Sequence, residues 1–284
     1  STASEQNLGR KPSCHLYNDP VVRMDNELKH RGLLEGGDLT VAQLNEFDQM
    51  HYLGTEALKE FVDIVSPPKN GRVLDVGSGF GGPARYWASE HKLRVVAMEL
   101  QDNLVAWSQK VTARVKNEVG DRVANVCGNI LELQDQPESF QSGYDAVTGF
   151  LVFLHVPDRP ACWKACFDAL NPGGAIYLED FFLLGELTPE HQQSATDVVG
   201  CSSIPTRDEF IAELGAAGFE KIEFTDVTET WTPFVDERHK QYVSNRKRHL
   251  EVQGETIVHD MTEFYSVVST LFRNGLGGVR LTAR

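Results

Sequence analysis

The sequence has few of the features that mark secreted, membrane or nucleic-acid-binding proteins. Its 284 residues contain five cysteines and no Cys-x-x-Cys pair. No apolar run approaches the ~20 residues that a membrane-spanning helix needs. Basic residues number 27 against 41 acidic ones, which gives a net charge of −14. Proteins that bind nucleic acid or anionic membranes normally carry a basic field, so both partners are disfavoured.

These absences predict a cytoplasmic protein whose cysteines are reduced. The odd number and scattered positions of the cysteines argue against a disulfide framework. Cys162 and Cys166 lie one helical turn apart, but no further ligand nearby completes a metal set, so no metal is expected. No signal peptide is visible. The composition is otherwise that of a globular protein long enough to bury an α/β core.

The most informative stretch is residues 73–82, where an apolar run leads into a glycine-rich turn and a helical pattern. Small residues fill the turn at Gly77, Ser78, Gly79, Gly81 and Gly82. Strand, glycine turn and helix in this order form nucleotide sites at the carboxyl edge of α/β sheets. The spacing Gly-x-Gly-x-Gly fits a nucleoside methyl donor, whereas Gly-x-Gly-x-x-Gly fits a dinucleotide, so the turn alone leaves both open.

Two carboxylates accompany this turn. Asp75 can accept hydrogen bonds from turn amides or lie beside a cationic ligand, and its charge would repel a pyrophosphate. Glu99 ends the strand pattern of residues 93–99, 24 positions after Asp75. A carboxylate at that position can accept both ribose hydroxyls of an adenosine. Dinucleotides and nucleoside methyl donors both carry that ribose, so Glu99 does not choose between them.

Together these segments resemble class I S-adenosylmethionine-dependent methyltransferases. The resemblance rests on residues 74–81, Glu99 and residues 171–174, and it covers roughly residues 70–184. Residues 47–54 and 154–159 are similar to small-amine N-methyltransferases, namely those of phosphoethanolamine and those that convert sarcosine and dimethylglycine to glycine betaine. The resemblance implies S-adenosyl-L-methionine as cofactor and S-adenosyl-L-homocysteine as product.

The fold implied by the resemblance is a Rossmann-like α/β fold with helices on both faces and a helical cap. Its seven-stranded, mostly parallel sheet has the order 3-2-1-4-5-7-6, with strand seven antiparallel. Later strands are expected within residues 123–130, 144–155, 175–182, 221–229 and 277–283. We expect a helical cover over residues 1–70, the cofactor-binding core over 71–234, a helical insertion capping the substrate site over 235–274 and the last strand over 275–284.

Donor contacts follow from the resemblance. They are expected at Asp75, Gly77, Ser78, Gly79, Gly81, Glu99, Leu100, Asn129, Ile130, Leu151, Leu53 and Gly54. Asn129 stands where the family usually has an acid, but its amide oxygen can still accept a bond from the adenine amino group. Ile130 would form an apolar wall for the ring.

Acceptor contacts are expected from polar and aromatic residues near the same edge. The candidates are Gln49, Tyr52, His155, Asp180, Tyr242 and Arg246. His155 matches the last histidine of the family motif after strand four and is the candidate catalytic base. Arg246 lies in a basic helical pattern, residues 235–252, from which it could bind a carboxylate bidentately.

We therefore expect N-methylation of a small amino acid, namely sarcosine and dimethylglycine. An aromatic pocket suits the ammonium product, with candidates Tyr52, Phe153, Phe181 and Trp231. Phe150 and Leu151 replace a polar pair of the family motif, which disfavours phosphoethanolamine and keeps open an O- or C-methyltransferase of a lipophilic metabolite. An NAD-dependent dehydrogenase and a non-catalytic adenosine-binding module are the alternatives of another class. No oligomeric state is predicted.

Overall fold

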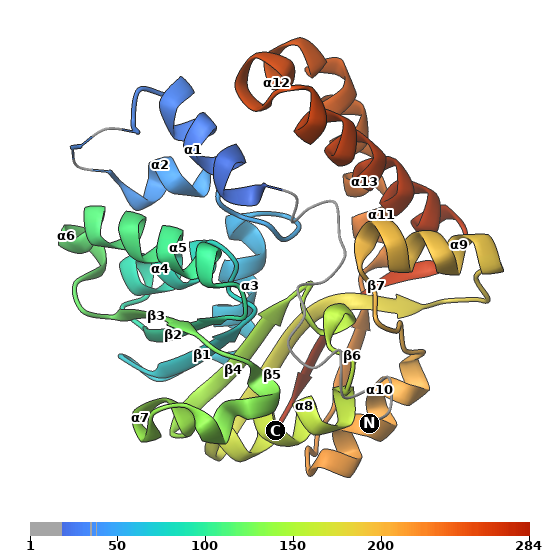
Figure 1. Ribbon diagram of the computed structural model, residues 1–284. Helices are drawn as coiled ribbons and strands as arrows, with labels where there is room; N and C mark the ends of the chain where they lie inside the picture. Colours follow the sequence, from blue (N-terminus) through green and yellow to red (C-terminus); the bar gives the residue numbers. More distant parts are fainter. Residues whose placement is uncertain (1–18, 35, 38) are drawn as a thin grey trace.

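The computed structural model describes residues 19–34, 36–37 and 39–284, and its strands form one sheet (Figure 1). The strands are β1 (Arg72–Val76), β2 (Arg94–Glu99), β3 (Val123–Cys127), β4 (Tyr144–Phe150), β5 (Leu170–Leu183), β6 (Glu223–Asp226) and β7 (Leu276–Ala283). Their order is β3-β2-β1-β4-β5-β7-β6. The first five pair in parallel, and β7 is antiparallel to both of its neighbours. The predicted order and orientation are confirmed.

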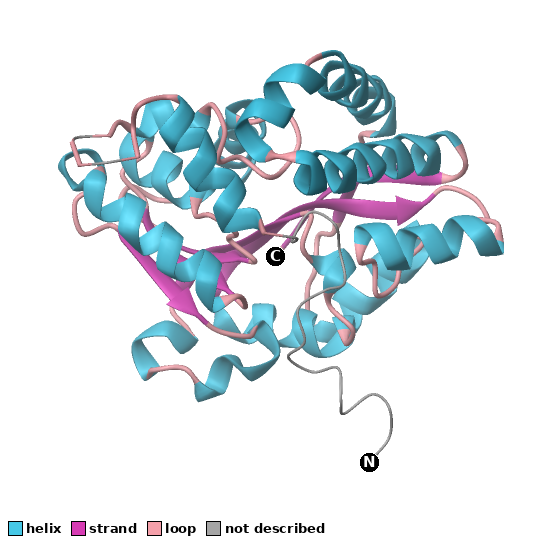
Figure 2. Ribbon diagram, turned by 45° about the horizontal axis from the view of Figure 1, so that its top comes forward, coloured by secondary structure: helices cyan, strands magenta, loops and turns pink. Residues whose placement is uncertain are grey.

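Helices lie on both faces of this sheet, as predicted (Figure 2). They are α1 (Pro20–His30), α2 (Val41–Asn45), α3 (Thr55–Val65), α4 (Gly82–Glu90), α5 (Asp102–Arg114), α6 (Lys116–Val119), α7 (Glu138–Gln141), α8 (Arg159–Ala169), α9 (Pro189–Ser194), α10 (Arg207–Ala217), α11 (Thr228–Ser244), α12 (Arg246–Gln253) and α13 (Glu255–Arg273).

Alternation along the strands builds the two helical layers. Val73 and Val95 pack in a cluster with side chains of α3 and α4, whereas Leu74 and Val96 pack with those of α8 and α10. Successive side chains of a strand point to opposite faces. A parallel strand covered on both sides therefore reads as a nearly continuous apolar run, which is why β1 and β2 were recognisable in the sequence.

The N-terminal cover and the last helices meet above the carboxyl edge of the sheet. α1 packs against α12. Glu27 of α1 and Arg248 of α12, 221 positions apart, form an ion pair at 2.6 Å. Below them, Tyr52 packs in an apolar cluster with Trp231 of α11 and Phe272 of α13. The N-terminal cover and the helices α11 to α13 thus close over the same region of the core.

Three segments differ from the prediction. The strand expected over 221–229 is limited to β6, because Asp226 accepts the Thr228 amide at 2.9 Å and so starts α11. The helical pattern expected over 235–252 is divided at Asn245 into α11 and α12. The strand expected within 175–182 begins earlier, at Leu170, and residues 171–174 form a bulge inside β5, where pairing jumps from Tyr144–Leu170 to Ala146–Ala175.

No helix in the described part of the chain has the length and apolar character needed to cross a membrane. Cys162, Cys166 and Cys201 are buried and Cys127 is exposed. Cys14 and the first 18 residues of the predicted cover lie outside the described residues.

Candidate active site

A cavity of about 640 Å³ opens at the carboxyl ends of β1, β2 and β4. Eleven of the predicted site residues line it: Tyr52, Asp75, Gly77, Ser78, Gly79, Glu99, Leu100, Asn129, Ile130, Leu151 and His155. The carboxyl ends of parallel strands meet at one edge of the sheet, and this brings together residues that are far apart in sequence.

The other predicted residues lie outside the wall of this cavity. Leu53 and Gly54 directly precede α3, and Gly81 directly precedes α4. Asp180 is buried and accepts amides of the turn after β4. Gln49 and Tyr242 line a second cavity beside it. Arg246 is exposed at the start of α12 and lines neither cavity.

The glycine turn between β1 and α4 needs its glycines for two separate reasons. Gly77 and Gly79 have φ of +64° and +53°, a region that side-chain-bearing residues rarely adopt. A Cβ on Gly77 would also lie 2.1 Å from the Val152 Cγ2 atom. The turn therefore presents bare backbone to the cavity.

Glu99 fixes the geometry of this turn. Its Oε2 atom accepts the Gly79 amide at 3.0 Å, and its Oε1 atom accepts the Gln101 amide at 2.9 Å. Each carboxylate oxygen has a second lone pair, so Glu99 can still accept two hydroxyl groups from a ligand. The carboxylate thus connects the first and second strands of the site.

Asp75 leaves an unsatisfied charge at the cavity wall. Its Oδ1 atom accepts the Thr148 hydroxyl at 3.1 Å, but its buried Oδ2 atom has no hydrogen-bond partner among the described residues. Burial raises the pKa of Asp75 to about 7, and the nearby charge of Glu99 adds to this rise. An unpaired buried carboxylate oxygen is costly, and a cationic ligand group would relieve that cost. The site therefore fits a positively charged nucleoside.

His155 ends the short turn Phe153–His155 after β4. Its Nδ1 atom lies 2.9 Å from the Gly200 carbonyl oxygen. A carbonyl oxygen only accepts, so Nδ1 carries the proton and Nε2 has the lone pair. Burial lowers the pKa of His155 to about 4, which keeps the imidazole neutral at physiological pH.

Asp180 positions this turn from beneath. Its Oδ2 atom accepts the Phe153 and Leu154 amides at 2.8 and 3.2 Å. The sequence suggested that Asp180 meets a cationic substrate, but the side chain points to the turn and not to the cavity. It acts on His155 indirectly, because it holds the backbone just before it.

An aromatic wall completes the cavity. Tyr52 and Phe181 line it, whereas Trp231 and Phe153 are buried outside its lining. The Trp231 ring meets the Tyr52 ring edge-on, with centroids 4.8 Å apart. Arg238 belongs to the same basic pattern as Arg246, which was preferred from the sequence, and it is Arg238 that lines the cavity. Its guanidinium lies 6.0 Å from the centre of the Tyr52 ring.

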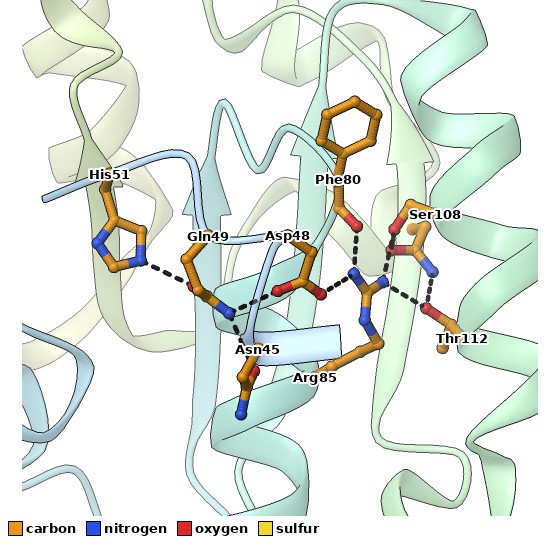
Figure 3. Close-up of polar contacts among 9 residues, drawn as sticks. Asn45, Asp48, Gln49, His51, Phe80, Arg85, Ser108 and Thr112 are labelled. Atoms are coloured by element: carbon orange, nitrogen blue, oxygen red, sulfur yellow. Dashed lines mark hydrogen bonds and ion pairs between the residues drawn. The ribbon is translucent and has the colours of Figure 1, made fainter. Parts of the chain in front are cut away.

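A buried ion pair connects the N-terminal cover to the glycine turn (Figure 3). Arg85 of α4 meets Asp48 at 2.9 Å, and both side chains are 0% exposed. The guanidinium also donates to the Phe80 carbonyl and to the hydroxyls of Ser108 and Thr112. Four residues of the cover, the turn and α5 are thus held together by one interior cation of α4.

The same network continues toward the cavity wall. Gln49 donates to Asp48 and Asn45, and its carbonyl oxygen lies 2.9 Å from His51 Nε2 (Figure 3). The other His51 nitrogen lies 2.9 Å from the Tyr52 carbonyl oxygen. Residues 48–52 are therefore positioned by polar contacts that start at Arg85.

Residues 74–178 match the family model described as a methyltransferase domain. A phosphoethanolamine N-methyltransferase from Triticum aestivum is 30% identical over 128 residues, which cover 45% of this chain and 24% of that protein. The chain thus matches about a quarter of the length of that relative. The resemblance to methyltransferases is confirmed over residues 74–178.

Solved structures show the same fold. One is phosphoethanolamine N-methyltransferase 2 from Haemonchus contortus in complex with phosphomonomethylethanolamine and S-adenosylhomocysteine (TM-score 0.73, 17% identity, 86% of this chain and 56% of that one). Another is a candidate sarcosine dimethylglycine methyltransferase from Galdieria sulphuraria (TM-score 0.71, 15% identity, 92% and 97%). At these identities they support the fold alone.

Proposed function

We propose that this chain, whose residues 74–178 form a methyltransferase domain, is an S-adenosylmethionine-dependent N-methyltransferase of a small amine or amino acid. Sarcosine and dimethylglycine are the proposed acceptors, and glycine betaine is the proposed final product. One observation carries the proposal: Asp75, Glu99 and the glycine turn share a cavity with His155 and an aromatic wall. The phosphoethanolamine N-methyltransferase relative named above is consistent with an amine acceptor.

On the donor side, S-adenosylmethionine supplies an electrophilic methyl group that a nucleophile attacks in line. Glu99 would accept the ribose hydroxyls, and the unpartnered oxygen of Asp75 would face a cationic part of the donor. Asn129 and Ile130 would contact the adenine. The Asn129 oxygen also accepts the Leu131 amide at 3.1 Å, which orients it beside the cavity.

On the acceptor side, the barrier falls when nitrogen and methyl carbon are held close and aligned. Tyr52 and Phe181 provide π faces for an ammonium group. A secondary amine such as sarcosine must lose a proton, and the lone pair of His155 can take it. Dimethylglycine must likewise be unprotonated to attack, but its product is a quaternary ammonium that has no proton left to lose.

Methylation of oxygen or carbon on a lipophilic metabolite is the second candidate. Phe150, Leu151 and Phe264 line the cavity and make part of its wall apolar. A dinucleotide dehydrogenase is disfavoured, because the buried Asp75 carboxylate at the cavity wall would repel a pyrophosphate.

A label-transfer assay tests the proposed function. The chain is incubated with methyl-labelled S-adenosylmethionine and, separately, glycine, sarcosine, dimethylglycine, phosphoethanolamine, a phenol and a sterol. We expect label in sarcosine and dimethylglycine. The Gly77→Val variant is the control, because its side chain would occupy the space of Val152 and block the donor site. Transfer only to the phenol or sterol supports the second candidate, and transfer to no amine rejects the proposal.

Asp75 predicts a pH-dependent donor affinity. A cation bound beside it lowers its pKa, so donor binding releases a proton wherever the free carboxyl is protonated. Above pH of about 7 the carboxyl is already ionised and the affinity is flat. Below that pH we expect the affinity to fall by up to about tenfold per unit. The pKa of His51 and of His155 is about 4, so neither titrates in this range. Burial also raises the pKa of Asp180 to about 7, but Asp180 does not line the cavity, and the Asp75→Asn variant separates the two carboxyls.

Calorimetry with S-adenosylmethionine between pH 5.5 and 8 measures this effect. The Asp75→Asn variant should bind more weakly and lose the dependence. An affinity of the unaltered protein that stays constant across the range would contradict the role assigned to Asp75.

A further inference from the structure

A second cavity of about 510 Å³ adjoins the first one. It lies between the N-terminal cover and the helices α11 to α13. The two cavities share Met50 and Arg238. The ionisable side chains of the second one, apart from His249 and the tyrosines, are Arg23, Arg31, Arg238, Arg248, Glu27 and Glu46. In a chain of net charge −14, this wall has more positive than negative groups.

Arg238 differs from its neighbours in this set. Arg31 pairs with Glu27 and Glu46, and Arg248 pairs with Glu27. No carboxylate in the described part of the chain forms an ion pair with Arg238. Its guanidinium instead lies 6.0 Å from the Tyr52 ring centre and 5.0 Å from that of Tyr265. The two rings hold the group in place without neutralising its charge.

We propose that Arg238 binds the anionic group of the methyl acceptor, so that the cavity selects amines that also carry an oxyanion. This inference rests on the proposed N-methyltransferase function. A guanidinium matches a carboxylate or a phosphate with two parallel hydrogen bonds. Tyr52 lies between the two ends of such a molecule: Arg238 is over its ring, and the ring lines the donor cavity.

The charge balance favours a carboxylate over a phosphate. One unpaired guanidinium neutralises one carboxylate. A phosphate with close to two charges would need a second cation, but Arg31 and Arg248 are already engaged by glutamates. Arg23 donates to the Met261 sulfur at 3.1 Å and, unlike Arg238, does not line the donor cavity. An α-amino acid also places its acid within two bonds of the nitrogen, so both ends fit against one aromatic ring. The inference thus specifies N-methylated amino acids as the acceptor class.

The test compares acceptors with and without the acid. Dimethylglycine, N,N-dimethylethanolamine and phosphoethanolamine are assayed with the unaltered protein and with Arg238→Gln. We expect Arg238→Gln to raise KM for dimethylglycine about ten- to a hundredfold, since a bond to a charged group is lost. The rate with dimethylethanolamine should not change. Arg238→Lys should recover part of the loss, because lysine restores the positive charge but cannot form the two parallel hydrogen bonds of a guanidinium.

Two further variants separate recognition from general charge. Lys240→Gln removes the same charge from an exposed position two residues further along α11 and should leave all rates unchanged. Arg246→Gln tests the arginine expected from the sequence. Binding of S-adenosylhomocysteine, measured by calorimetry, should be equal in all variants, because Arg238 is not assigned to the donor.

A binding measurement tests the role of Arg238 without requiring methyl transfer. The complex with S-adenosylhomocysteine is titrated with dimethylglycine. If the protein binds dimethylglycine through Arg238 but methylates no amine, the role of Arg238 in binding the anionic group is supported and the proposed function is rejected. If amines are methylated and Arg238→Gln affects acidic and neutral acceptors equally, or Arg246→Gln alone has the effect, the assignment of Arg238 is overturned while the function stands. A preference for phosphoethanolamine over dimethylglycine overturns the carboxylate choice.

Discussion

Replacing Arg85 with methionine is expected to lower the free energy of unfolding by about 3–5 kcal/mol. The substitution leaves the Asp48 carboxylate buried without its cation, and both side chains are 0% exposed in the folded protein. It also removes the donor to the Phe80 carbonyl and to the hydroxyls of Ser108 and Thr112. Each buried polar group that is left without a hydrogen-bond partner adds a desolvation cost. Urea denaturation followed by circular dichroism measures the change.

An exposed ion pair on α8 provides the control. Lys164 and Asp168 interact with both side chains 58% exposed. Lys164→Met should cost less than about 1 kcal/mol, because water screens and replaces the interaction. Asp48→Asn should fall between the two, since the amide oxygen still accepts a hydrogen bond from Arg85. If Arg85→Met costs no more than Lys164→Met, the buried pair does not hold the cover to the core.

Replacing Glu99 with alanine is expected to weaken S-adenosylhomocysteine binding by at least about a hundredfold. The variant loses the acceptor proposed for two ribose hydroxyls, and bonds to a charged group contribute about 1.5–3 kcal/mol each. It also leaves the Gly79 and Gln101 amides without the carboxylate that orients them. Titration calorimetry measures the affinity, and a thermal unfolding curve checks that the protein is folded.

Two further variants show whether the loss of affinity is specific to the Glu99 carboxylate. Asp102→Asn removes one charge three positions away at the exposed start of α5 and should leave the affinity unchanged. Glu99→Gln keeps one acceptor oxygen but turns an amide group toward a backbone N–H, so its loss should be intermediate. An affinity of Glu99→Ala within threefold of the unaltered protein would refute the donor site described here.

Polar residues outside the parallel strand ends were harder to place from sequence. Asp180 lies with Glu179 beside two aromatic residues at the carboxyl end of β5, a pattern that suggested contact with a cationic substrate. In the folded protein it accepts the amides of the turn before His155. Its contact with these backbone amides depends on how closely β5 approaches that turn. This distance cannot be read from the spacing of residues in the sequence.

The sequence also did not identify which arginine of the helices above the site reaches the cavity. An unbroken helix over residues 235–252 would place Arg238, Tyr242 and Arg246 on one face, because they are four residues apart. The helix ends at Ser244, and α12 begins with Arg246 in a new direction. Arg238 and Tyr242 keep the inward face, and Arg246 is exposed. One break of the helix at Asn245 thus decided which arginine reaches the cavity.

The sequence by itself determined the core of this protein: the strand, the glycine turn and the acid at the end of the second strand. These are local signals, because alternation sets the face of each side chain and parallel strands bring their carboxyl ends to one edge. Only the tertiary structure decided what covers that edge. The Asp48–Arg85 pair and the place of Arg238 depend on the angles at which the cover and the cap pack on the sheet, and those angles arise from contacts between residues far apart in the chain.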